Sequence, residues 1–187
     1  MFRTAIVCMS DKGARGERED LSTKVIEKIV TEKGYKIVKK ILIPDEYELI
    51  KETLKNICDN NEADLILTTG GTGFAKRDVT PEATLEIVDK IVPGIPEAIR
   101  AYSMSITKRA MLSRAAAGIR KSTLIINMPG SPKAVDESLS FMVKYKNRFI
   151  DLKYLSAGTV EQIYLAVRLA AGEILYPKEP VPVLMDD

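Results

Sequence analysis

A glycine-rich stretch, residues 68–81 (TTGGTGFAKRDVTP), constrains the fold of this chain more than any other feature. It follows an apolar run at residues 65–67, and three glycines fall within four positions, at Gly70, Gly71 and Gly73. Because glycine has no Cβ atom, the backbone there can adopt positive φ and let a ligand approach its N–H groups. The stretch therefore predicts a tight connection from a buried strand to a helix.

The second half of this stretch combines a helix start with charged side chains. Thr80 and Pro81 are typical of an N-cap followed by a first helical residue. Lys76 and Arg77 bring positive charge beside the glycines, and Asp78 adds a carboxylate. Two interpretations stay open at this point: a site for a metal-bound phosphate, or a tight turn with a solvated charged flank.

Two stricter phosphate-binding motifs do not fit the glycine-rich stretch. Counted from Gly70, a P-loop would need a glycine where Ala75 stands. Counted from Gly71, the dinucleotide-binding pattern would need its third glycine where Lys76 stands. The chain therefore indicates neither a P-loop NTPase nor an NAD-dependent enzyme.

The composition excludes several classes of protein. Among 187 residues there are 28 Lys and Arg, 26 Asp and Glu, and no His, so no catalytic triad with histidine and no His-ligated zinc site can form. Positive and negative side chains are nearly equal in number, so the composition does not indicate a nucleic-acid-binding protein. The N-terminus has no signal-peptide pattern, and no apolar run approaches the roughly 20 residues of a membrane span. We expect a cytoplasmic protein that binds neither nucleic acid nor membrane.

Strand-like and helix-like segments alternate along the chain. Apolar strands are expected at residues 2–9, 35–43, 65–69 and 122–128. Helices are expected at residues 20–33, 50–60, 97–106, 132–145 and 160–171, and also after Pro81 with Leu85, Val88, Ile91 and Val92 facing inward. Residues 11–20 are expected to form a loop, and residues 111–120 a short helix and a loop.

This alternation predicts a Rossmann-like α/β fold of three layers, in which helices cover both faces of a mainly parallel sheet. Residues 1–175 are expected to form a single domain, and residues 176–187 a proline-rich tail. Ligands of such sheets bind beyond the carboxyl ends of the strands. We therefore expect a site where the segments after the four strands meet. These segments contain Ser10 and Asp11; Pro44 and Asp45; Gly70, Gly71, Thr72 and Gly73; and Pro129, Gly130, Ser131 and Pro132.

Three segments of the chain together resemble the MogA/MoaB family: residues 42–46 (LIPDE), 67–84 and 112–135. The likeness covers about residues 3–145, and the motifs appear in the family's order. Members of the family include molybdopterin adenylyltransferases and the G domain of gephyrin-type proteins. The resemblance implies Mg²⁺-dependent transfer of AMP from ATP to molybdopterin, with release of pyrophosphate, in molybdenum-cofactor biosynthesis. It also implies a homotrimer and hand-over of the product to a molybdenum-insertion enzyme.

The resemblance also assigns roles to individual residues. The family's two functional aspartates fall on Asp45 and Asp78, which are the expected catalytic residues and metal ligands. Asp78 stands two residues before the expected N-cap, so neither helix capping nor a core position is expected to require its carboxylate. Substrate and nucleotide binding is expected at Ser10, Asp11, Gly70, Gly71, Thr72, Gly73, Pro129, Gly130, Ser131 and Pro132.

Alternatives to this function stay open. The chain could be a non-catalytic molybdopterin-binding or scaffold module of the same family, or a nucleotide hydrolase that uses the same two aspartates. The sequence does not distinguish molybdenum from tungsten as the metal of the finished cofactor.

Overall fold

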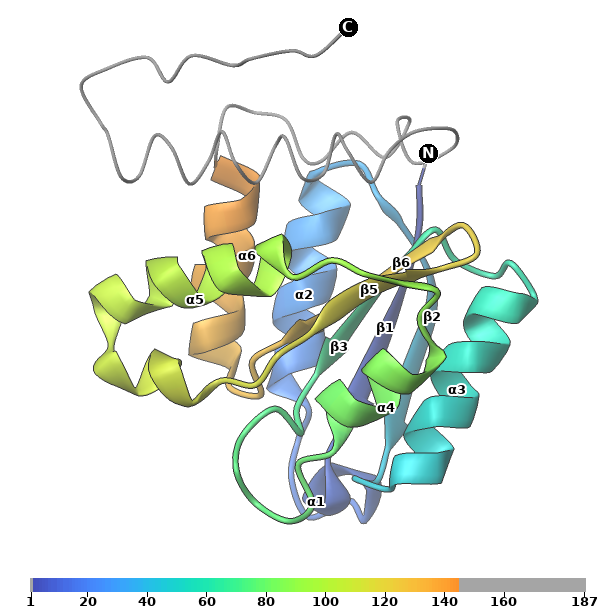
Figure 1. Ribbon diagram of the computed structural model, residues 1–187, viewed down its shortest axis with the longest axis horizontal. Helices are drawn as coiled ribbons and strands as arrows, with labels where there is room; N and C mark the ends of the chain where they lie inside the picture. Colours follow the sequence, from blue (N-terminus) through green and yellow to red (C-terminus); the bar gives the residue numbers. More distant parts are fainter. Residues whose placement is uncertain (1, 145–187) are drawn as a thin grey trace, which may run out of the picture.

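The computed structural model describes residues 2–144, in which six strands form one sheet (Figure 1). The strands lie in the order β2-β1-β3-β6-β5-β4. Their bounds are Arg3–Met9 for β1, Lys36–Ile43 for β2, Leu65–Thr69 for β3, Lys90–Ile91 for β4, Ala117–Arg120 for β5 and Thr123–Met128 for β6. β2, β1, β3 and β6 pair in parallel, whereas β5 and β4 pair antiparallel with their neighbours. The expected α/β fold with a mainly parallel sheet is therefore confirmed.

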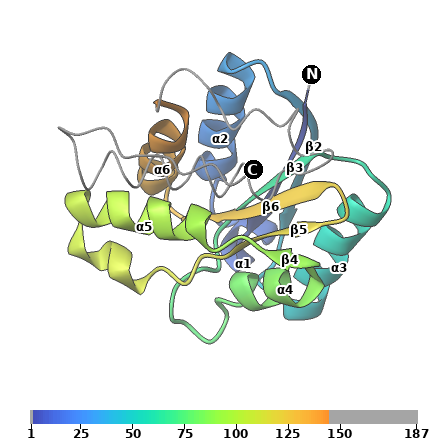
Figure 2. The ribbon, with the colours of Figure 1, turned by 45° about the horizontal axis from the view of Figure 1, so that its top comes forward.

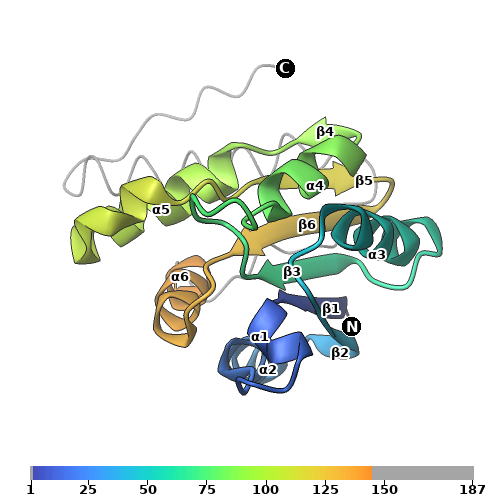
Figure 3. The same cartoon turned by 90° about the horizontal axis from the view of Figure 1, so that it is seen from below.

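Helices cover both faces of this sheet. Their bounds are Asp11–Ala14 for α1, Leu21–Glu32 for α2, Tyr47–Asp59 for α3, Thr80–Ile87 for α4, Gly94–Ile106 for α5 and Pro132–Lys144 for α6, with a 3-10 helix, η1, at Lys108–Leu112. α2, α5 and α6 lie on one face, and α3 and α4 lie on the other (Figures 2 and 3).

Two separate apolar clusters hold these layers together, because successive side chains of a strand point to opposite faces of the sheet. Ile6 of β1 packs in the cluster under α2, α5 and α6, while its neighbours Ala5 and Val7 pack in the cluster under α3 and α4. β3 and β6 are buried along their whole length. Such continuous burial is typical of central parallel strands with helices on both sides.

The expected helix after Pro81 is wrong in its second half. α4 ends at Ile87, Val88 is extended, and Lys90–Ile91 forms the edge strand β4. The Asp89 N–H donates to the carbonyl of Ile119 at 2.8 Å, next to the pairing of β4 with β5. Because the edge of β5 offers backbone partners, Lys90 and Ile91 pair with it instead of continuing the helix. The β-branched side chain of Ile91 also favours a strand.

Two further expectations from the sequence need correction, and three lie outside the described residues. Ala117–Arg120 is strand β5, not part of a loop, and the expected loop at 11–20 begins with the short helix α1. The expected helix at 160–171, the domain end at residue 175 and the proline-rich tail lie outside residues 2–144. Within residues 2–144, no helix is long and apolar enough to cross a membrane.

An ion-pair cluster fastens the β5–β6 turn to the end of α3. The Arg120 guanidinium donates to both carboxylate oxygens of Asp59, at 3.0 and 2.8 Å, and the Lys121 ammonium lies 3.0 Å from Asp59 Oδ1. A third guanidinium nitrogen of Arg120 donates to the carbonyl of Ile87 at 2.8 Å. The hydrogen bonds from Arg120, followed by those from Lys121, lower the pKa of Asp59 from 3.8 to about 2.

This cluster predicts a loss of stability in acid. Because the pKa of Asp59 is lower in the folded protein than in the unfolded chain, the ionised carboxylate stabilises the fold above about pH 4, and its contribution disappears as the pH falls towards 2. The thermal midpoint of Asp59→Asn should lie below that of the wild type at neutral pH, and the difference should shrink towards zero near about pH 2. A difference that stays constant over this range would contradict the assignment.

Candidate active site

The loops that follow β2, β1, β3 and β6 meet at one edge of the sheet, where Figure 1 shows α1 beside the loop that leads to α4. The Ser10 N–H donates to the carbonyl of Ile43 at 2.9 Å, which joins the ends of β1 and β2. The Thr69 hydroxyl donates to the carbonyl of Pro129 at 2.6 Å, which joins the ends of β3 and β6. The structure therefore brings together all four segments that the sequence placed at this edge.

Gly70 and Gly71 form the turn after β3, and both have positive φ, at 96° and 63°. A Cβ atom on Gly70 would lie 2.2 Å from the carbonyl oxygen of Met9, and one on Gly71 would lie 2.3 Å from Thr80 Oγ1. Both positions thus require glycine for backbone conformation and for close approach. Gly73 does not share the positive φ; a Cβ there would lie 2.8 Å from Asp78 Oδ2.

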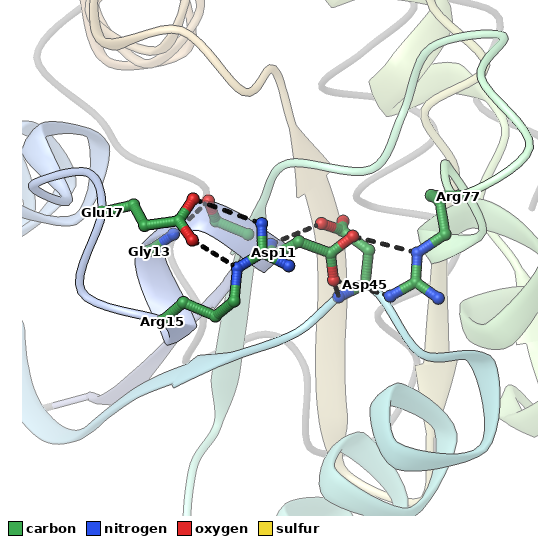
Figure 4. Close-up of polar contacts among 7 residues, drawn as sticks. Asp11, Gly13, Arg15, Glu17, Asp45 and Arg77 are labelled. Atoms are coloured by element: carbon green, nitrogen blue, oxygen red, sulfur yellow. Dashed lines mark hydrogen bonds and ion pairs between the residues drawn. The ribbon is translucent and has the colours of Figure 1, made fainter.

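Asp11 and Asp45 bind each other through reciprocal hydrogen bonds (Figure 4). The Asp11 N–H donates to Asp45 Oδ2 at 2.9 Å, and the Asp45 N–H donates to Asp11 Oδ1 at 3.0 Å. The Arg77 guanidinium donates to both oxygens of Asp11, at 3.0 and 2.6 Å. Asp11 therefore links the loops after β1, β2 and β3, and it holds Asp45 in place.

The two carboxylates differ in electrostatic environment. Burial raises the pKa of Asp45, and the nearby charges of Asp11 and Asp78 raise it further. The hydrogen bonds from Arg77 lower the pKa of Asp11. Asp45 is thus a partly buried carboxylate that an added cation would stabilise in its ionised form.

Asp78 lies in a turn that its own carboxylate closes. Asp78 Oδ2 accepts a hydrogen bond from the Ala75 N–H at 2.8 Å, and the Asp78 N–H donates to the Ala75 carbonyl at 2.9 Å. As expected, the carboxylate neither caps a helix nor lies in the core, but it does accept a hydrogen bond within its own turn. Asp45 Oδ1 lies 3.2 Å from the position of a Cβ on Gly71, and Asp78 Oδ2 lies 2.8 Å from that of a Cβ on Gly73, so both carboxylates lie against the glycine turn.

The start of α4 also differs from the expectation. Val79, not Thr80, is the N-cap residue, and no side chain caps the helix. Thr80 is the first helical residue and is fully buried. The backbone N–H of Thr80 donates to the carbonyl of Gly71 at 3.2 Å. The glycine turn therefore provides a hydrogen-bond acceptor for one N–H group at the start of α4.

The turn after β6 agrees with the expectation. Ser131 Oγ accepts a hydrogen bond from the Ala134 N–H at 3.2 Å, as an N-cap residue does, and Pro132 opens α6. A Cβ on Gly130 would lie 3.3 Å from the Cα of Gly70, so the start of α6 lies next to the glycine turn. A helix start beside backbone N–H groups is a common arrangement for binding phosphate. Ser10, in contrast, uses its hydroxyl to accept from the Gly13 N–H and cap α1.

Arg114 braces the glycine loop, a role that the sequence did not indicate. The backbone N–H of Arg114 donates to the Thr72 carbonyl at 3.0 Å, and the side-chain Nε donates to the Gly73 carbonyl at 2.7 Å. Its remaining guanidinium nitrogens bind the Asp78 carbonyl and the Glu82 carboxylate. The partners of the guanidinium lie 32 to 41 positions away in the chain, so no local pattern distinguishes Arg114 from the other cations.

Carboxylates at this edge of the sheet could hold a cation only together with oxygen atoms from a ligand. Within residues 2–144, no group of three or more Cys, Asp or Glu side chains is placed to hold a metal ion. Asp45 and Asp78 could contribute one carboxylate each, and a bound phosphate would supply the remaining oxygens. Mg²⁺ is usually bound in this way.

Comparison with known proteins gives a consistent result. Residues 5–148 match a family model described as "Probable molybdopterin binding domain". A Helicobacter pylori protein named molybdopterin adenylyltransferase is 42% identical over 141 residues, which cover 72% of this chain and 77% of that protein. The Escherichia coli K12 protein of the same name is 40% identical over 140 residues, which cover 74% of this chain and 72% of that protein.

The fold is also similar to solved structures. The crystal structure of the molybdopterin biosynthesis enzyme MoaB from Thermus thermophilus matches with a TM-score of 0.73 and 45% sequence identity. The match covers 78% of this chain and 92% of that structure.

The glycine turn yields a direct prediction. Gly71→Val would place a branched side chain against Thr80 Oγ1 and 3.2 Å from Asp45 Oδ1, and it would add backbone strain of about 1–3 kcal/mol. The variant should fold with a lower thermal midpoint, and calorimetry should show lost affinity for two ligands that the name of its relatives implies, molybdopterin and ATP.

Gly34→Val is the matched control, because Gly34 also has positive φ but nothing lies within 4 Å of an added Cβ. It should lose stability and keep both affinities. Unchanged ligand binding in Gly71→Val would show that the turn has no part in the site.

Proposed function

Since this chain belongs to the family described as the probable molybdopterin binding domain, we propose that it is a molybdopterin adenylyltransferase of molybdenum-cofactor biosynthesis, which uses ATP and Mg²⁺. The observation that carries the proposal is the position of Asp45 and Asp78 beside a glycine turn and a helix start. That combination suits a reaction in which two anionic phosphates must be brought together.

In the proposed reaction, an oxygen of the terminal phosphate of molybdopterin attacks the α-phosphorus of ATP. A new P–O bond forms, the bond from the α-phosphorus to the bridging oxygen breaks, and pyrophosphate leaves. The main task for the protein is therefore to align two phosphates and to offset their charge.

Asp45 and Asp78 would hold Mg²⁺. The fit rests on Asp45, because its burial and its acidic neighbours disfavour a carboxylate that has no added cation nearby. When bound, Mg²⁺ would act as a Lewis acid on phosphate oxygens.

Phosphate oxygens would bind to backbone N–H groups of the glycine turn and at the start of α6. This assigns phosphate binding through backbone N–H groups to Gly70, Gly71, Thr72 and Gly73, and to Gly130 and Ser131. Pro129 and Pro132 have no N–H to donate, so they would shape the turn that holds the substrate. Ser10 and Asp11 complete the proposed site, and their contacts indicate that they act by holding the loops in place.

One experiment separates this function from its alternatives. The protein is incubated with ATP, Mg²⁺ and molybdopterin, and the products are separated by chromatography. Adenylylated pterin with an equal amount of pyrophosphate supports the proposal. AMP formed without adenylylated pterin would indicate a hydrolase, and binding without turnover would indicate a non-catalytic module.

Asp78→Asn tests the proposed catalytic role. The amide can still accept the hydrogen bond from the Ala75 N–H, so the free energy of unfolding should change by less than about 0.5 kcal/mol. Loss of the charge should lower kcat for pyrophosphate release at least about 10²-fold, or roughly 2.7 kcal/mol, and leave molybdopterin affinity intact.

Glu32→Gln is the control for Asp78→Asn, because it removes an exposed carboxylate at the last residue of α2. It should leave kcat, affinity and thermal midpoint unchanged. Wild-type turnover in Asp78→Asn would reject a catalytic role, and loss of folding would make Asp78 a structural residue.

We also propose that the protein acts in the cytoplasm as a homotrimer and passes its product to a molybdenum-insertion enzyme. Exposed apolar side chains at Met104, Ile106, Met111 and Leu112 support an assembly surface on α5 and η1. Light scattering at micromolar concentration should give about three times the chain mass of 20.7 kDa. A monomer would contradict the assembly and leave the proposed reaction untouched.

A further inference from the structure

Thr80 has a buried hydroxyl that no other group in residues 2–144 contacts through a hydrogen bond. The residue is fully buried, and within residues 2–144 its Oγ1 atom has no hydrogen-bond partner. The helix start does not explain the hydroxyl, because Val79 is the N-cap residue and no side chain caps α4. A buried polar group without a partner is destabilising, and valine would fill nearly the same volume without that cost.

The hydroxyl lies against the centre of the site. Thr80 Oγ1 lies 2.3 Å from the position that a Cβ atom of Gly71 would occupy, and Asp45 Oδ1 lies 3.2 Å from the same position. Both oxygen atoms therefore lie close to the one position that a side chain on Gly71 would occupy. The backbone adds a further link, because the Thr80 N–H donates to the Gly71 carbonyl.

The two carboxylate oxygens of Asp45 differ in their hydrogen bonds. Oδ2 accepts the hydrogen bond from the Asp11 N–H, while Oδ1 accepts none within residues 2–144. A hydroxyl is both a donor and an acceptor, whereas an ionised carboxylate is an acceptor only. Thr80 and Asp45 are thus chemically complementary, one as a donor and the other as an acceptor.

We propose that Thr80 is a positioning residue whose hydroxyl donates to Asp45 Oδ1 when ligands fill the site, which fixes the orientation of that carboxylate towards the reacting phosphates. The inference rests on the proposed function for the identity of those ligands. It implies that the hydroxyl contributes nothing to the stability of the unliganded protein and contributes to the liganded complex.

The test compares three variants. Thr80→Val removes the hydroxyl at nearly constant volume, Thr80→Ser keeps it, and Thr4→Val is the matched control. Thr4 is also fully buried with an unpartnered hydroxyl, but it lies in β1 near the opposite edge of the sheet. The measurements are the thermal midpoint without ligand, ATP affinity by calorimetry with Mg²⁺, and kcat and KM for pyrophosphate release with molybdopterin.

We expect Thr80→Val to keep or exceed the wild-type midpoint without ligand. It should bind ATP more weakly and lose kcat at least about tenfold, the effect of one hydrogen bond to a charged group, with little change in KM for molybdopterin. Thr80→Ser should retain kcat within about threefold, because it keeps the donor. Thr4→Val should keep or exceed the wild-type midpoint as well, with unchanged kcat and ATP affinity.

Three results would overturn the inference. The first is that Thr80→Val has the kcat and the ATP affinity of the wild type. The second is that the thermal midpoint or the folding yield of Thr80→Val lies below that of Thr4→Val. The third is that Thr80→Ser folds but has no turnover. If the wild type binds ATP but releases no pyrophosphate, the proposed function is wrong, but the inference about Thr80 is still tested. The ATP affinities of the three variants then decide whether Thr80 contributes to ligand binding.

Discussion

The reciprocal hydrogen bonds between Asp11 and Asp45 are the contact on which the site depends. Parallel strands deliver their loops to one edge of the sheet but do not fix how those loops meet. Here each aspartate binds the backbone N–H of the other, and Arg77 then ties the glycine loop to Asp11. Asp45 is consequently held by the fold at one oxygen, while its other oxygen remains directed at the glycine turn.

The glycine loop is held from the opposite side by Arg114. Three carbonyl groups between residues 72 and 78 accept from this one residue, and each contact spans more than 30 positions of the chain. Guanidinium suits this task because its five N–H groups have a fixed geometry. Asp78 thus lies in a loop that is short in sequence but fixed by distant residues, which is the support that a preorganised charged site needs.

Sequence patterns predicted most local features and the edge at which the loops meet, but they missed the N-cap of α4 and several individual long-range contacts. The central strands, the turn at Gly70 and Gly71 and the cap at Ser131 follow from burial, backbone conformation and helix capping, which neighbouring residues determine. The strand β5 and the end of α4 were missed because the pairing of Ala117 and Ile119 with an edge strand overrides helical periodicity. The role of Arg114 could not be predicted, because its partners become neighbours only in the folded chain.

Two unfavourable features meet at the site: a partly buried carboxylate and a buried hydroxyl without a partner in residues 2–144. Asp45 is partly buried beside two other carboxylates, and Arg77, whose charge favours the ionised form of Asp45, is already paired with Asp11. Thr80 nearby keeps a hydroxyl without a partner in residues 2–144. The two apolar clusters that flank the sheet supply stability that can offset these unfavourable features. Because a cation and a phosphate would together relieve the charge and supply hydrogen-bond partners, the same features that destabilise this part of the fold favour binding of both ligands at once.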